Sequence, residues 1–280
     1  MKKLFFLFAL LICPIAFCFG QLSVSGVAGN NDYSAMRAAY NWNPLPLVPL
    51  TVTPKFNMYT QKDMYTQKDM DTMYQYGLGA KAKVPFYDLL EVGLDGAYTP
   101  KANEYSNYYW DAHAALNIEN LLFHIMPLDA LKVGLGYKTI YHSFYNPDYD
   151  VTEQDIYTFL YAQKSGFDIN LQYSKAIDFS NDKKGTPLWL DIPGFTAVNQ
   201  GYLDYALGVD AGYTYKIIRP YAGYTYVKID NASSTDDARL GIIVSVLMIN
   251  FNASVEWFDV SKNAGNRQTF YSLTAGVSIL

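Results

Sequence analysis

The sequence predicts an all-β protein, a closed antiparallel β-barrel of about fourteen strands that crosses a membrane. The first observation is an alternation of apolar and polar residues with a period of two, which indicates strands with two different faces. The second is that the alternating segments run for about ten to thirteen residues, close to the roughly nine to eleven that a tilted strand needs to cross a bilayer. The third is that short connections alternate with longer, more polar ones, as they do in membrane barrels.

Composition excludes several other classes of protein. The chain has 280 residues, of which 50% are apolar and 26 are tyrosine, with a net charge of −5. Disordered chains have few aromatic residues and high charge, and two cysteines are too few for a disulfide scaffold. A bundle of membrane helices needs repeated apolar runs of about 18 residues, which the sequence lacks beyond its N-terminus. The acidic balance, with no basic stripe, predicts no nucleic-acid partner.

Residues 1–20 have the layout of a secretory signal peptide, and residues 21–280 form the barrel. Two leading lysines precede the apolar run 4–12, and Gly20 supplies a small residue at the expected cleavage site. An uncleaved membrane anchor is the alternative, but the run is short and Pro14 interrupts it. Both cysteines lie in this segment, so the mature chain has no thiol for disulfides, metal ligands or a nucleophile.

The rest of the chain divides into fourteen predicted strands. The run 240–249 is too short to span a membrane as a helix, and its alternation suits a strand. If the first hairpin is not part of the wall, the count falls to twelve. The strands are expected near 21–29, 33–43, 47–58, 72–84, 89–99, 107–118, 130–140, 155–164, 167–178, 202–215, 219–229, 237–247, 250–260 and 269–280.

The connections predict which end of the barrel faces outward, because outer-membrane barrels have short periplasmic turns and longer outer loops. Two connections depart from this rhythm: 29–32 is a short outer one, and 119–129 is a long apolar inner one with an expected helical turn before Pro127. A duplicated hexapeptide, MYTQKD, at 58–69 preserves strand parity and lengthens an outer loop. The short turns are 44–46, 85–88, 165–166, 216–218 and 248–249; the longer loops are 59–71, 100–106, 141–154, 179–201, 230–236 and 261–268.

The two faces of the strands have different expected surroundings. In hydrocarbon every backbone polar group must be paired, which closed barrels achieve, so the apolar face meets lipid and the polar face meets the lumen. Glycines on the polar face, such as Gly134 and Gly136, favour free space inside. The lumen-lining candidates are Lys81, Lys83, Glu91, Asp95, Asp111, His113, Lys132, Lys138, Asp168, Asp204, Asp210, Arg239 and Glu256, and the membrane-interface aromatics are Trp42, Trp110, Tyr213, Tyr224 and Trp257.

With these features the chain resembles bacterial outer-membrane β-barrel proteins of the porin-like class. The resemblance rests on the leader, the alternation along the mature chain, and the final strand at 270–280. It implies export to the outer membrane of a Gram-negative cell, with the lipid bilayer, periplasmic chaperones and the barrel-assembly machinery as partners. Members of the class often end on an aromatic residue, whereas this chain ends in Leu280 and its apolar face ends at Ile279.

The favoured function is a narrow water-filled channel for passive diffusion of small polar solutes. Twelve to fourteen strands leave room inside, whereas eight do not, and charges of both signs in a lumen bias which solutes pass. The alternative is a non-conducting structural or adhesive barrel whose loops 141–154 and 179–201 bind a partner.

An outer-membrane hydrolase is the least favoured function. His142 and Ser143 are adjacent, so on a strand they point to opposite faces, which is the wrong spacing for a catalytic pair unless the loop bends. Asp111 and His113 share a face but suit a hydrogen bond in the lumen better than acid–base catalysis. We therefore expect no enzyme, no cofactor and no metal.

Overall fold

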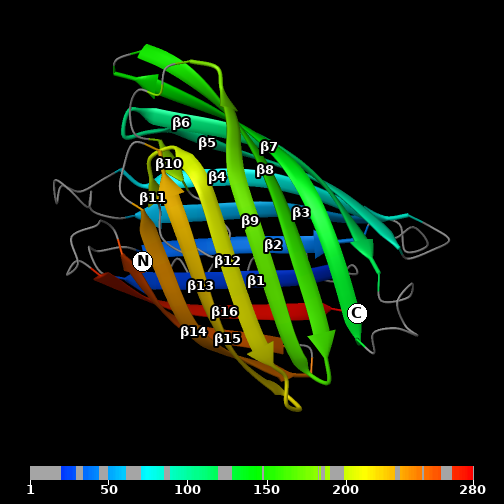
Figure 1. Ribbon diagram of the computed structural model, residues 1–280. Coiled ribbons are helices and arrows are strands. Elements are labelled where there is room, and N and C mark those ends of the chain that lie inside the picture. The colour runs from blue at the N-terminus through cyan, green and yellow to red at the C-terminus, as the bar shows by residue number, and fades with distance from the viewer. Residues whose placement is uncertain are drawn as a thin grey trace.

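The computed structural model confirms the closed antiparallel barrel of fourteen strands (Figure 1). Strand β1 pairs with β2 on one side and with β16 on the other, so the first hairpin belongs to the wall and the twelve-strand alternative is wrong. The structure describes residues 20–29, 34–43, 50–60, 71–84, 89–118, 128–146, 148–181, 183, 187–189, 199–230, 234–247, 249–259 and 267–279.

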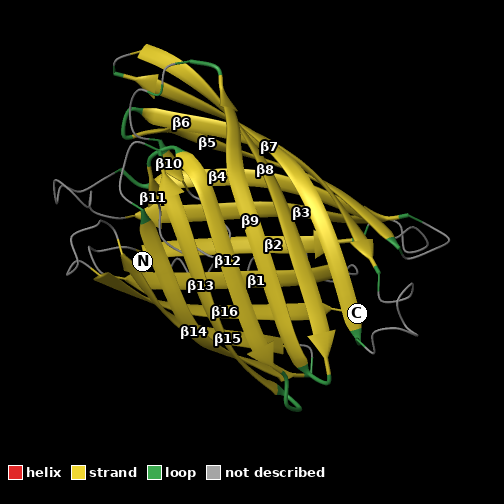
Figure 2. Ribbon diagram, in the orientation of Figure 1, coloured by secondary structure: helices red, strands yellow, loops and turns green. Residues whose placement is uncertain are grey.

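The wall strands follow one another around the barrel, each antiparallel to its neighbours (Figure 2). Within the described residues, no helix is long and apolar enough to cross a membrane. The wall strands are β1 (Gly20–Gly29), β2 (Ser34–Trp42), β3 (Leu50–Thr60), β4 (Met73–Lys83), β5 (Leu90–Ala102), β6 (Tyr105–Asn117), β7 (Ala130–Tyr145), β8 (Asp148–Lys164), β9 (Phe167–Phe179), β12 (Leu203–Tyr213), β13 (Ile218–Ile229), β14 (Thr235–Val246), β15 (Ile249–Asp259) and β16 (Arg267–Ile279).

The end that carries the connections β2–β3, β4–β5, β6–β7, β8–β9, β12–β13 and β14–β15 is called the inner end here, following the rule that periplasmic turns are short. Its described turns are tight, as predicted. Ser165 and Gly166 join β8 to β9 with φ of 50° and 85°, the backbone of a two-residue hairpin whose twist matches its strands. Lys216 and Leu247 also have positive φ at the next two turns.

Two loops predicted at the outer end are strand instead. The predicted loop 100–106 contains the ends of β5 and β6, joined through Asn103 and Glu104 with φ of 53° and 58°. The predicted loop 141–154 contains the outer ends of β7 and β8, which pair from Tyr145 and Asp148 inward. Polar composition predicted loops here, but the strands continue, because the ladder is formed by backbone groups that polar and apolar residues share.

The connection between β9 and β12 contains a second, small sheet, formed by β10 (Leu188–Trp189) and β11 (Asn199–Gln200). Several predicted features lie outside the described residues: the expected signal peptide through residue 19, the turns 44–46 and 85–88, the expected helical turn before Pro127, most of the MYTQKD repeat, and Leu280.

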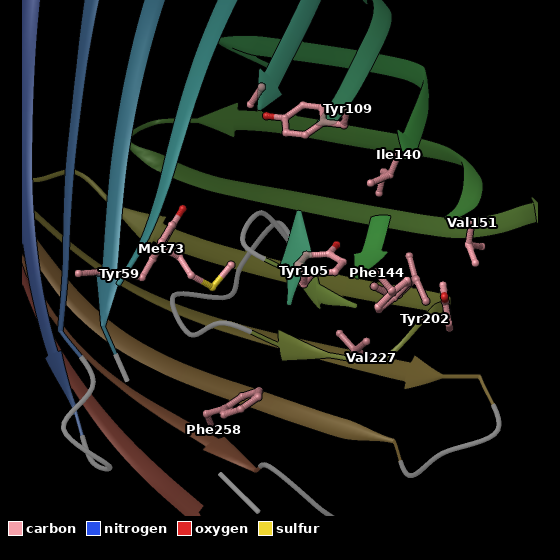
Figure 3. Packing of buried hydrophobic residues seen from close by; sticks show 14 of the residues in the cluster. Tyr59, Met73, Tyr105, Tyr109, Ile140, Phe144, Val151, Tyr202, Val227 and Phe258 are labelled. Atoms are coloured by element: carbon pink, nitrogen blue, oxygen red, sulfur yellow. The ribbon is translucent and has the colours of Figure 1, made fainter. Parts of the chain in front are cut away.

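Apolar side chains point into the barrel near its outer end, from strands on opposite sides (Figure 3). Tyr59, Phe144 and Phe258 are buried there. The predicted polar interior therefore needs a correction at this end, where the inward-facing positions carry large apolar residues. Leu203 is part of this cluster although its alternation placed it on the lipid face, because the register shifts between Leu203 and Tyr205 and a bulge exchanges the two faces.

Candidate functional site

A polar cavity occupies the middle of the barrel, and we call it the central cavity. It has a volume of about 470 Å³ and receives side chains from β1, β2, β8, β9 and β12 to β16. A second cavity of about 260 Å³ shares three lining residues with it, Ser25, Arg37 and Thr274. The two are therefore continuous along the wall near β1 and β2. The lining of the larger cavity is dominated by arginine, aspartate, asparagine, serine and threonine.

Two arginines reach this cavity by crossing glycines. Arg219 on β13 extends over Gly212 on β12 and binds Asp168 on β9, with Nε donating to Oδ2 at 2.8 Å. Arg239 on β14 lies over Gly223 and binds Asp210 on β12, with Nε donating to Oδ1 at 3.0 Å. Each ion pair spans three adjacent strands, because a middle residue without a side chain lets the guanidinium lie flat on the wall.

Aromatic residues use the same arrangement. The ring of Tyr157 lies over Gly136, and its hydroxyl donates to Asp111 at 2.8 Å. The ring of Tyr221 lies over Gly241, and its hydroxyl donates to Asn252 at 3.0 Å. Another ring, that of Phe159, lies over Gly134. The expectation that these glycines mark free space needs correction: neighbouring rings occupy the places beside them, and the open volume lies further toward the axis.

A group of charges lies at the inner end of the barrel. Glu91 on β5 accepts from Lys132 on β7 at 2.8 Å and pairs with Lys81 on β4 at 2.8 Å. A separate pair, Lys55–Asp95, joins β3 to β5 across β4. The single carboxylate of Glu91 therefore pairs with two ammonium groups, so this group of charges has a net positive charge.

The other predicted lumen candidates are placed as follows. His113 Nδ1 lies 3.2 Å from Asp111 Oδ1, and the imidazole covers Gly93. Lys138 lies over the ring of Tyr109, at 4.4 Å from Nζ to the centroid. The remaining three lie away from the central cavity: Lys83 is exposed at the inner end of β4, Asp204 is at the register shift of β12, and Glu256 is buried near the outer end.

A buried polar network lies among the apolar residues of the outer end. Tyr105 Oη lies 2.7 Å from His142 Nδ1, and His142 Nε2 lies 2.9 Å from Glu153 Oε2. The ring of Tyr202, just before β12, packs edge-on against the imidazole. Burial raises the pKa of the Tyr202 hydroxyl, so it stays neutral. The network ties the end of the β9–β12 connection to β7 and β8.

The same network bears on the hydrolase hypothesis. His142 is 2% exposed and bonded to Tyr105 and Glu153 inside the barrel. Ser143 follows it on β7 and pairs with Ser106, so its side chain points to the opposite face. The two groups lie on opposite sides of the wall, and no nucleophile–base contact forms between them. Among the described residues, no group of three metal-ligating side chains gathers.

The predicted interface aromatics lie at different heights on the strands. Trp42 and Tyr213 are exposed at the inner ends of β2 and β12. Trp110 and Tyr224 are exposed nearer the middle of their strands, and Trp257 is half-buried toward the outer end of β15. Tyr224 donates its hydroxyl to Asp236 at 3.1 Å. Their arrangement in two girdles stays a prediction.

Three basic residues of the interior were missed in the candidate set: Arg37, Lys55 and Arg219. Each occupies the polar parity of its strand, and the register pairs each with residues of the same face. Arg37 was not predicted as a lumen residue because nearby alanines weaken the alternation of apolar and polar residues between Ser34 and Trp42. Lys55 and Arg219 each stand beside a proline, Pro54 and Pro220, which hides a strand signal. Parity alone would have found all three.

No family model and no curated protein matches the chain. Among solved structures, OpdK from Pseudomonas aeruginosa, described with vanillate, is similar with a TM-score of 0.50 at 9% identity, over 93% of this chain and 97% of that one. Omp33 from Acinetobacter baumannii gives 0.49 at 11% identity over 94% and 98%, and the KdgM porin gives 0.46 at 10% over 93% and 99%. At these identities the likeness concerns the fold, which is that of a porin-like outer-membrane barrel.

Proposed function

We propose that this protein is an outer-membrane channel through which small polar solutes diffuse passively. The observation that carries the proposal is the central cavity, a polar space of about 470 Å³ enclosed by the barrel. Barrels of more than eight strands leave an interior that their own side chains do not fill. Large side chains that cross glycines lie flat against the wall, which supports an open volume toward the axis.

The outside of the barrel supports a location in lipid. Leu78, Leu94 and Leu135 on β4, β5 and β7 are 59%, 63% and 67% exposed. So many exposed large apolar side chains are unfavourable in water. In hydrocarbon they are favourable, and a closed barrel leaves no unpaired strand edge there. The inner polar cavity and the outer apolar surface together match a conduit across a bilayer.

The test is single-channel recording with purified protein refolded in planar bilayers. Steady current steps are expected from the native chain. Ser272→Trp should lower the conductance, because Ser272 lines the central cavity and an indole would fill part of it. Leu273→Trp is the matched control, since Leu273 is its neighbour on the outer face and 62% exposed. Absence of current from barrel that is demonstrably folded would overturn the proposal.

A non-conducting structural or adhesive barrel is the second candidate, and one observation favours it. The buried cluster around Tyr105, Phe144 and Tyr202 lies inside the outer end, where a solute would enter. If that cluster closes the entrance permanently, the folded protein is silent in the same recordings. The two candidates therefore predict opposite results from one measurement.

A further inference from the structure

The side chains that line the central cavity are polar or aromatic throughout. Its described lining residues are serine, threonine, asparagine, tyrosine, aspartate and arginine, with no aliphatic side chain among them. An apolar solute in this space would displace water from polar groups without replacing the lost hydrogen bonds, which costs free energy. The lining therefore disfavours apolar solutes and leaves charged and neutral polar ones to be compared.

The charged side chains of this cavity are engaged by the protein itself. Arg219 is bound to Asp168, and Arg239 is bound to Asp210. Arg37 also has a partner in the protein. Charge-assisted hydrogen bonds of this kind are the strong ones. A charged solute that binds to these groups therefore has to compete with contacts that already exist.

The groups that are left for a solute are neutral. In the part of the chain that the structure describes, the side chains of Ser25, Asn170 and Thr274 make no hydrogen bond to the protein, although all three line the cavity. Asn252 accepts a hydrogen bond from Tyr221 through Oδ1, which leaves its amide nitrogen for another acceptor. Hydroxyl and amide side chains can each donate and accept, so they match a solute whose own groups do both.

Three of these neutral groups form a row on one wall of the cavity. The register places Ser25 on β1 opposite Thr274 on β16, and Thr274 opposite Asn252 on β15. Neighbouring strands lie about 4.8 Å apart, so directly opposed side chains on one face are close together. A solute with several hydroxyl groups around a ring can bond to more than one of them at once, which a solute with a single polar group cannot do.

A tyrosine ring adds a flat apolar surface beside this row. The ring of Tyr221 lies over Gly241, and its hydroxyl bond to Asn252 at 3.0 Å holds it next to the amide. The C–H face of a sugar ring can pack on such an aromatic face while its hydroxyl groups bond at the side. The cavity volume of about 470 Å³ also lies within the range of about 300–1,000 Å³ that small-molecule sites have.

Resting on the channel function proposed above, we infer that the central cavity binds neutral polyhydroxylated solutes, sugars and polyols of about hexose size, as they pass. Ser25, Asn170 and Thr274 are the residues that distinguish them from neutral solutes of similar size that carry few hydroxyl groups. Hydrogen bonds to these side chains lower the free energy of the hydroxylated solute inside the cavity, so its flux at low concentration is raised.

The experiment measures the entry of radiolabelled glucose into vesicles that contain the refolded protein, at a sugar concentration too low to saturate the site. The reference solute is labelled tetraethylene glycol, a neutral polyether of similar size with hydroxyl groups only at its two ends. The leak into protein-free vesicles is subtracted for both. Glucose is expected to enter faster than tetraethylene glycol.

Asn170→Leu and Thr274→Val remove the polar groups and nearly keep the shapes of the side chains. Each should lower the ratio of glucose flux to tetraethylene glycol flux by roughly fivefold, the factor that corresponds to one hydrogen bond of about 1 kcal/mol. Neither side chain has a hydrogen bond to the protein to lose, so a purely structural role predicts no change in this ratio.

Thr51→Val is the matched control. Thr51 has the same hydroxyl group on the inward face of β3, where the register pairs it with Lys81, but it is not among the described lining residues of either cavity. Its replacement should leave the ratio of the two fluxes unchanged. Folding of every variant is checked by the migration of unboiled samples in gels.

The outcomes separate the two proposals. If no folded sample conducts ions in planar bilayers, the channel function itself fails. If the protein conducts but glucose enters no faster than tetraethylene glycol, the solute inference fails and the channel function stands. The solute inference also fails if labelled gluconate, the corresponding carboxylate, enters faster than glucose, because charge then selects the solute. Equal effects of Thr51→Val and Thr274→Val would contradict it as well, because the polarity of the whole interior would then be responsible.

Discussion

Gly136 on β7 has no side chain, so the ring of Tyr157 lies directly against the backbone there, and the tyrosine hydroxyl reaches Asp111 on β6. The same relation holds for Arg239 over Gly223. Such glycines have no required positive φ, so their conformational freedom is not what matters. They matter because any Cβ would occupy the position of the neighbour's ring or guanidinium.

Gly136→Ala tests this at the residue scale. A Cβ built there lies 2.2 Å from Cζ of Tyr157, so the ring must move and its bond to Asp111 is lost. Overpacking of this kind destabilises by about 1–3 kcal/mol. Urea unfolding of the protein refolded in lipid vesicles measures the change. Gly26→Ala is the control, because nothing lies within 4 Å of its added Cβ; its effect is expected within about 0.5 kcal/mol. Equal effects at both positions would contradict the explanation.

At the scale of the element, the pairing of β1 with β16 closes the barrel and decides the strand count. The register places Ser25 opposite Thr274, and both side chains line the central cavity. A sheet that ended at β2 would leave an open strand edge in lipid, which is not tolerated. Closure through these two strands is therefore as important to the fold as any hairpin.

Ser25→Cys with Thr274→Cys tests the closure. The chain from residue 21 onward contains no other cysteine, so a disulfide between the two strands is expected on mild oxidation, since directly opposed residues on one face have neighbouring Cβ atoms. Non-reducing gels and thiol titration detect it. Val24→Cys with Thr274→Cys is the control, because adjacent strand residues face opposite sides. Free thiols in the first pair would mean that β1 does not close the wall.

The bulge in β12 changes which residues of the strand face the interior. Tyr205 pairs with Lys228 and Leu203 pairs with Ile229, which leaves Asp204 as the additional residue. Leu203 thereby joins the interior cluster. Alternation read along the sequence assigns it to lipid, because a period of two carries no information on where a residue is inserted into the pairing.

On the scale of the whole molecule, the surface of the barrel is apolar. Its interior is polar in the middle and apolar near the outer end. Closed barrels of this kind stay folded in unheated detergent and unfold on boiling, because the backbone hydrogen bonds of the wall join every strand to both of its neighbours. We expect the unboiled protein to migrate differently from the boiled protein in a gel. Purification of residues 21–280 as a monodisperse species without detergent would contradict the membrane location.

The alternation of residues by itself determined the fold class and most of the strand bounds, because the two faces of a strand differ along its length and short turns mark where strands end. The choice between twelve and fourteen strands was decided by the pairing of β1 with β2 and β16. Pairing across the barrel decided the rest. Arg219 meets Asp168 at a separation of 51 residues, over a glycine of a third strand, and the outer end fills with apolar side chains from strands far apart in sequence. Such contacts depend on the register and stagger between strands, and these are fixed only when the barrel closes.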